Sequence, residues 1–262
     1  MHNKSDQIGG IKMANEDFLI LDGNLIRYSG DNEDVVIPNG VTKILNGAFQ
    51  TYCVKSVVIT DTVKELEKSA FSSCFNLKSV SLSSGLTEIS EKAFYGCGSL
   101  ETINIPSGIL KIGNEAFVLC VELADVMLPL GLTEIGECAF QYCNKLEAVN
   151  IPDSVVKMEH RAFAYCPNLK TVVISKSIKT IDLFTFAGCK NLNSVVIPNG
   201  VEEIKKMAFG GCVNLERITI PKTVEIIGEA VFENCEKLTI HAPAGSYAEQ
   251  YAKENNIPFV AI

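Results

Sequence analysis

The feature that most constrains this chain is a phenylalanine that returns at an almost fixed interval. The first step between these phenylalanines is 22 residues, and every later step is 23. They are Phe49, Phe71, Phe94, Phe117, Phe140, Phe163, Phe186, Phe209 and Phe232. A fixed period of roughly 20 to 50 residues is typical of a solenoid, a propeller or an array, in which each repeat buries its apolar edge against the next.

Other positions of the repeat keep their residue types at fixed distances from the phenylalanine. Alanine precedes the phenylalanine in seven copies, and from Cys74 onward a cysteine follows at three residues and a leucine at six. Next comes a branched pair two residues apart, such as Val149 and Ile151, often followed by proline. A second apolar pair three residues apart, such as Val201 and Ile204, ends the repeat.

Each part of the repeat predicts a local structure. The branched pair alternates with period two, which predicts a short strand with both side chains in the core. Proline and glycine then end the strand and turn the chain. The second apolar pair is expected to cross the opposite wall as a short extended stretch or a loose turn. The Ala-Phe-x-x-Cys segment has helical spacing and predicts a single helical turn. We expect about ten strands, stacked at roughly 4.8 Å.

The full pattern, L-x-x-V-x-I-P-x-x-V-x-x-I-x-x-x-A-F-x-x-C, resembles the BspA-like leucine-rich repeat family over about 200 of the 262 residues. The resemblance implies a β-rich solenoid, a leucine-rich repeat right-handed superhelix with a parallel concave sheet. It also implies a role in protein–protein interaction, often at bacterial cell surfaces. Pro-x-Gly-like turns stand where many leucine-rich repeats carry asparagine after the strand, so no asparagine ladder is expected there.

Both ends of a solenoid need caps, because the end coils would otherwise expose apolar edges. Apolar runs around Asp22-Gly23-Asn24 predict an N-terminal β-hairpin cap over residues 16–40. Ser246, with Glu249 three residues later, predicts the start of a helix in a C-terminal cap over residues 241–262. Residues 41–240 between them form the repeat solenoid, in one continuous domain. Residues 1–15 show no pattern and are expected to be a flexible leader.

The cysteines form a column with one member per coil, for which three roles were compared. Structural zinc needs four ligands, whereas a column offers each ion two near sulfurs. Disulfides between neighbouring coils fit the permitted Cα separation, although parallel side chains suit the required torsion poorly. We interpret the cysteines as small apolar residues that fill the core beneath phenylalanine. Cys138 lies outside the column near a convex turn, where exposure is expected.

Composition and charge argue against several classes of function. A net charge of −8 and a pI near 5.0 disfavour nucleic acid and anionic membranes as partners. No segment reaches the roughly 20 apolar residues that membrane insertion needs. None of the three histidines, His2, His160 and His241, occurs in a sequence motif that would combine it with a nucleophile and a carboxylate. The sequence also contains no nucleotide-binding or zinc-hydrolase motif. We therefore expect no catalysis, cofactor or metal.

The residues that alternate with the branched pair face away from the core, and they form the candidate binding site. The predicted partner-binding residues are Asp125, Met127, Asn150, Thr171, Val173, Ser194, Val196 and Arg217. Exposed apolar side chains are costly unless a partner covers them. The alternative is that β-branched and hydroxyl residues occur there only because they favour strands.

Two functions agree with this reading of the sequence. One is a non-catalytic scaffold that binds a partner protein on its concave face. The other is a structural spacer or repeat segment of a larger cell-surface protein, an adhesin, without a ligand of its own. Location stays open, because ten cysteines and the lack of an apolar leader favour a reducing compartment while the resemblance favours the bacterial cell surface.

Overall fold

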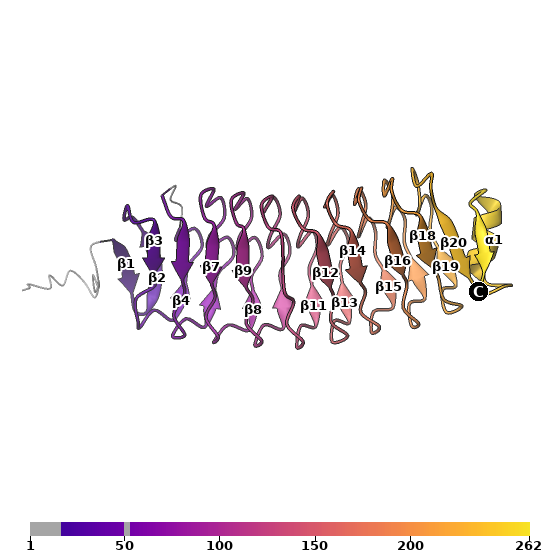
Figure 1. Ribbon diagram of the computed structural model, residues 1–262. Coiled ribbons are helices and arrows are strands. Elements are labelled where there is room, and N and C mark those ends of the chain that lie inside the picture. Colours follow the sequence, from indigo (N-terminus) through magenta and orange to yellow (C-terminus); the bar gives the residue numbers. More distant parts are fainter. Residues whose placement is uncertain (1–16, 50–52) are drawn as a thin grey trace, which may run out of the picture.

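The computed structural model describes residues 17–49 and 53–262, and in these the chain winds into one elongated stack of coils (Figure 1). The strand β1 lies at one end of the stack and the helix α1 at the other. The solenoid expected from the 23-residue period is therefore confirmed. The flexible leader predicted for residues 1–15 lies outside the described residues.

One side of the coils carries the strands predicted from the branched pair, in all but one coil of the described part. These strands are β3 (Asp34–Val36), β5 (Ser56–Val58), β7 (Ser79–Ser81), β9 (Thr102–Asn104), β12 (Ala148–Asn150), β14 (Thr171–Val173), β16 (Ser194–Val196), β18 (Arg217–Thr219) and β20 (Thr239–Ala242). In the three-residue strands the middle side chain is buried and its two neighbours face outward. We call this outward surface the strand face.

The pairing on the strand face is parallel, as predicted, but it does not form one continuous sheet. One sheet holds β3, β5, β7 and β9, the pair β12 and β14 forms a second, and β16, β18 and β20 belong to a third. The strand expected around Val126 is absent: Asp125 and Met127 occupy its place without strand pairing, although Val126 is buried. The prediction of a strand in every coil was therefore wrong for this coil.

A second side of the coils carries the other apolar pair. Its two-residue strands are β4 (Lys43–Ile44), β6 (Glu65–Leu66), β8 (Glu88–Ile89), β10 (Lys111–Ile112), β11 (Glu134–Ile135), β13 (Lys157–Met158), β15 (Thr180–Ile181), β17 (Glu203–Ile204) and β19 (Ile226–Ile227). The second residue of each strand is buried. The expected short extended stretch is confirmed, and we call the surface that it forms the second face.

The third side, which we call the turn side, differs from its prediction. The Ala-Phe-x-x-Cys segment is a tight turn and not a turn of helix. The residues two before and two after the phenylalanine have left-handed backbone, for example Ser69 (φ 59°) and Ser73 (φ 63°) around Phe71. These kinks aim backbone N–H groups at the next coil, so that Phe71 N donates to Ala93 O at 2.9 Å. Hydrogen bonds therefore join the coils on all three sides.

The phenylalanines form one aromatic column through the core. From Phe49 to Phe232, successive ring centroids lie 4.6–5.9 Å apart and the planes are inclined by no more than 23°. Tyr28 stacks on the first ring, with centroids 5.4 Å apart. Tyr251 meets the last ring edge-on at 6.0 Å. Stacked rings add about 0.5–1.5 kcal/mol per pair to the burial of their area.

The cysteine column is buried beside this aromatic column, as predicted, and it also makes hydrogen bonds. Cys166 Sγ donates to Phe140 O at 3.1 Å, and Cys189 Sγ donates to Phe163 O at 3.2 Å. The same Phe140 carbonyl accepts the Cys143 N–H at 3.3 Å, so the thiol of the next coil satisfies its second lone pair. The cysteines from Cys74 to Cys235 carry free thiols.

Cys138 is also buried, with 7% of its surface exposed, so its expected exposure was wrong. It stands two residues before Phe140, at one of the left-handed positions (φ 54°). Its sulfur lies 3.9 Å from a carboxylate oxygen of Glu137. Burial, reinforced by the charge of Glu137, raises the pKa of the Cys138 thiol to about 11, so the thiol stays protonated near neutral pH.

The two predicted caps are present. β1 (Phe18–Leu21) and β2 (Asn24–Tyr28) form the antiparallel hairpin. α1 (Tyr247–Glu254) begins at Ser246, whose hydroxyl accepts the Glu249 N–H at 3.3 Å. β21 (Phe259–Ala261) then returns and pairs in parallel with β20. The domain boundaries proposed at residues 40 and 241 stay predictions.

Candidate interaction surface

The strand face presents two columns of outward side chains that run along the stack. The first residue of each strand supplies one column and the third residue supplies the other. All eight predicted partner-binding residues lie exposed on this face: Asp125, Met127, Asn150, Thr171, Val173, Ser194, Val196 and Arg217. Parallel pairing places Asn150 opposite Val173, and Ser194 opposite Arg217.

The second column contains the apolar part of this surface. Met127 is 79% exposed, Val173 59% and Val196 64%. Asn150 lies between Met127 and Val173 along the column, and Thr219 follows Val196. The first column is smaller and more polar, with Thr171 and Ser194 beside the two valines. The result is an apolar strip flanked by hydroxyl and amide groups.

Charged residues line one edge of the strand face and pair with one another. Lys55 binds Glu33 at 2.7 Å, and Lys170 binds Glu147 at 2.9 Å, each across one coil boundary. Such exposed pairs add little stability. They nevertheless give the strip a polar border along this edge, and a polar rim is typical of protein–protein interfaces.

Both interruptions of the strand-face sheet fall within the predicted surface. One is the coil of Asp125 and Met127, which lacks a strand, and the other lies between β14 and β16, which belong to different sheets. Backbone groups in a regular sheet are occupied by the ladder. At these two places the ladder stops, next to the exposed side chains of Met127, Val173 and Val196.

A second apolar cluster, which is not among the predicted contacts, lies nearer the N-terminus. Val36 is 61% exposed and Val58 is 43% exposed, in the same outward column. Val58 also borders a shallow hollow of about 550 Å3, together with Thr60, Asp61 and Ser81. The signal was the tripeptide Val-Val-Ile, which starts at residues 35, 57, 172 and 195, because a strand with period two buries only two of its three branched residues.

The described part of the chain has neither a metal site nor a membrane-spanning helix. Residues 17–49 and 53–262 contain no group of three or more His, Cys, Asp or Glu side chains placed to hold a metal ion. His160 Nε2 lies 2.8 Å from a Glu137 carboxylate oxygen on the surface. The longest helix in the described part has eight residues, and none there is long and apolar enough to cross a bilayer.

The fold and this surface define a class of protein, the parallel β-solenoids built from leucine-rich coils. A family model described as the BspA type leucine rich repeat region matches residues 24–147 and 110–239, in six copies. These two segments overlap and cover most of the chain, so the protein belongs to the BspA-type leucine-rich repeat family.

Solved bacterial structures are similar to this chain in fold. A leucine-rich repeat protein from Bacteroides ovatus is 24% identical, covers 91% of this chain and 71% of its own, and has a TM-score of 0.64. The leucine-rich repeat protein of T. pallidum is 26% identical, with 91% of both chains covered and a TM-score of 0.52. A leucine rich cell surface protein from Faecalibacterium prausnitzii is 24% identical over 96% of this chain and 98% of its own, with a TM-score of 0.49. A comparison with curated proteins found no match.

Proposed function

We propose that this protein is a non-catalytic scaffold that binds a partner protein on its strand face. The proposed contacts are Asp125, Met127, Asn150, Thr171, Val173, Ser194, Val196 and Arg217. The observation that carries the proposal is the exposure of Met127, Val173 and Val196 in one outward column. Exposed apolar side chains that are grouped on one face with a polar border are typical of interaction sites.

The stack supports this role physically, because the strip belongs to coils that pack against neighbouring coils on both sides. Each coil contacts its neighbours, and the repeated contacts extend one surface over many coils. Binding to a preorganised surface avoids the entropic cost of ordering loops. Thr171 and Ser194 are small, exposed side chains that lie beside the valines on β14 and β16.

The proposal is tested by a double variant on the strand face, Met127→Lys with Val173→Glu. The matched control places the same charges on the second face, Val156→Lys with Ile226→Glu, where the side chains are 62% and 53% exposed. Each purified chain is immobilised at physiological salt and offered bacterial lysate and host extracellular proteins. We expect the native chain and the control to retain the same partner and the strand-face variant to lose it.

Equal capture by all three chains, with equal thermal midpoints, would move the binding site away from the strand face. A second candidate function is a structural spacer, or a repeat segment of a larger cell-surface protein. The continuous aromatic column between Tyr28 and Tyr251 favours it, because such a core makes a stiff body. A spacer would retain no specific partner in the same experiment.

A further inference from the structure

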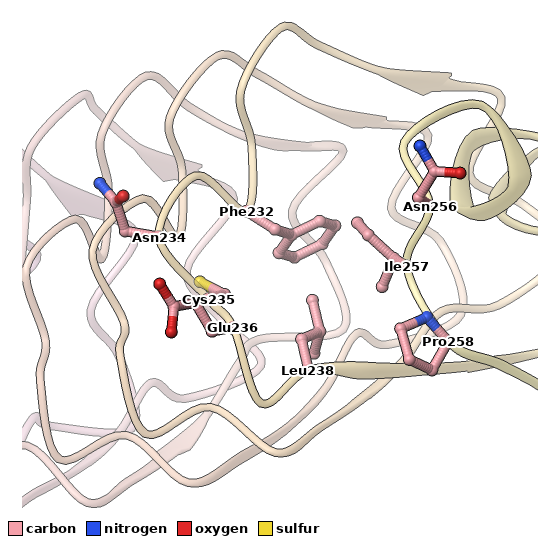
Figure 2. A pocket seen from close by; sticks show the side chains of 8 residues that line it. All are labelled: Phe232, Asn234, Cys235, Glu236, Leu238, Asn256, Ile257 and Pro258. Carbon is pink, nitrogen blue, oxygen red and sulfur yellow. The ribbon is translucent and has the colours of Figure 1, made fainter.

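The C-terminal end of the stack is only partly closed. A pocket of about 280 Å3 lies between the last coil and the segment that follows α1 (Figure 2). Phe232, Cys235 and Leu238 line it from the coil, and Ile257 and Pro258 line it from the opposite wall. It is separate from the strand face and takes no part in the function proposed above.

In the interior of the stack, the corresponding place is filled by the next coil through a constant set of hydrogen bonds. The N–H of each phenylalanine and the N–H two residues later donate to carbonyls of the following coil. Phe209 N donates to Val231 O at 3.0 Å, and Gly211 N donates to Glu233 O at 2.7 Å. The same two bonds recur in the coils before it, for example from Phe186 N to Ala208 O at 2.8 Å.

In the last coil these two donors have no partner in the described part of the chain. Neither Phe232 N nor Asn234 N donates a hydrogen bond there. Both residues border the pocket, and Asn234 keeps the left-handed backbone (φ 60°) that aims this N–H toward the next coil in the interior. The pocket therefore combines an apolar floor with two backbone donors already set at the spacing that an extended chain accepts.

The two elements of the cap lie on other parts of the last coil. β21 pairs with β20 on the strand side. α1 covers the Phe232 ring through Tyr251, edge-on at 6.0 Å. Cys235 is correspondingly 9% exposed, whereas Cys212 in the coil before it is fully buried. The cap thus replaces the ring of a further coil, but it gives the N–H groups of Phe232 and Asn234 no acceptor in the described part of the chain.

The border of the pocket is acidic. Glu236 lines the pocket and is exposed, and this carboxylate makes no ion pair within residues 17–49 and 53–262. Several exposed carboxylates elsewhere in the stack meet a lysine of a neighbouring coil, as Glu229 meets Lys206 at 2.7 Å. An occupant with a positive charge would supply the missing partner.

We propose that this pocket binds an extended peptide segment of a partner protein, one in which an aliphatic side chain lies next to basic residues. The peptide adds to the open turn-side ladder, and its carbonyls accept from Phe232 N and Asn234 N in the way that the next coil does in the interior. Its aliphatic side chain lies against Phe232, Cys235 and Leu238. Its lysine or arginine lies near Glu236. Addition of a strand to an open ladder is an established mode of peptide recognition.

The test follows the backbone amide resonances of the full chain by nuclear magnetic resonance during titration with the capped peptide acetyl-KALGK-amide. We expect the amides of Phe232 and Asn234 to shift, whereas those of Phe209 and Gly211 stay in place. A peptide with glycine in place of leucine should bind about tenfold more weakly, because the buried aliphatic contact is lost. The variant Glu236→Lys should weaken acetyl-KALGK-amide about fivefold, which is the size of an exposed charge effect.

Three results would overturn the proposal. The first is the absence of any shift at Phe232 and Asn234 with acetyl-KALGK-amide at millimolar concentration. The second is equal binding of the leucine and glycine peptides. The third is a shift of these amides with protein concentration alone, which would assign the pocket to a second copy of the chain. Glu236 is exposed, so its variant leaves the core intact, and the matched variant Glu216→Lys controls for total charge.

Discussion

The turn side and the strand face of this protein follow opposite rules. On the turn side the same residues return in every coil, with phenylalanine and cysteine at 0–2% exposure from Phe71 to Cys212. On the strand face the outward residue changes from coil to coil, from Ser81 to Asn104, Met127 and Val173. The inner columns therefore specify the fold, whereas the outer columns are free to vary from coil to coil.

The largest effect on stability that we expect from the inner columns is a loss at high pH. Burial raises the pKa of the Cys166 thiol from its ordinary value of 9.0 to about 12, and it raises the pKa values of Cys143 and Cys189 well above the ordinary value. A cysteine in the unfolded chain loses its proton near pH 9, whereas these folded cysteines keep theirs. The unfolded state therefore binds fewer protons, and stability falls as the pH rises from about 9 toward 12.

Each such cysteine contributes up to about 1.4 kcal/mol per pH unit in that window, so the chain loses several kcal/mol. Urea unfolding at pH 7, 9 and 10 measures the loss. The variant Cys166→Ala should show a smaller loss between pH 9 and 10 than the native chain. A free energy of unfolding that stays constant from pH 7 to 10 would contradict the assignment of the cysteines to the core.

The next test compares two aromatic residues of one coil. Phe140→Ala should lower the free energy of unfolding by about 3–5 kcal/mol, because the ring is fully buried between Phe117 and Phe163. Tyr142→Ala should cost about 1 kcal/mol, because this exposed ring loses only its stacking on Tyr165 at 5.1 Å. Chemical denaturation of both variants measures the two losses in the free energy of unfolding. Equal losses would contradict the separation of inner and outer columns.

The smallest test uses two adjacent valines of β16. Val195 is 2% exposed and Val196 is 64% exposed. We expect Val195→Ala to cost about 2 kcal/mol, since it removes buried methyl groups from a packed core. Val196→Ala should change stability by less than about 0.5 kcal/mol. Thermal unfolding of the pair would expose an error in the assigned strand register if the order of the two costs were reversed.

The period and the residue types were enough to predict the coils, the aromatic column, most of the strands and both caps. This worked because each inner position is repeated many times, so one local preference is confirmed by its copies. The eight residues of the candidate surface were also placed on one face, since alternation along a strand leaves no other side for them.

Three features could not be read in this way, each for a physical reason. The helical spacing of Phe and Cys concealed a turn with left-handed residues, although glycines at Gly96, Gly188 and Gly211 marked one of those positions. The missing strand at Met127 has no signal in the repeat, because Val126 keeps the usual buried residue type. The pocket beside Phe232 depends on how the C-terminal cap packs against the last coil, and this tertiary contact has no signal in the repeat.

Amide hydrogen exchange over the whole chain tests the central claim most directly, because the coils are joined by backbone hydrogen bonds at fixed intervals. The account predicts slow exchange at the phenylalanine amides from Phe71 to Phe209, repeated at 23-residue steps, and fast exchange at Phe232. Protection without that period, or fast exchange at the interior phenylalanines, would contradict the stack of coils.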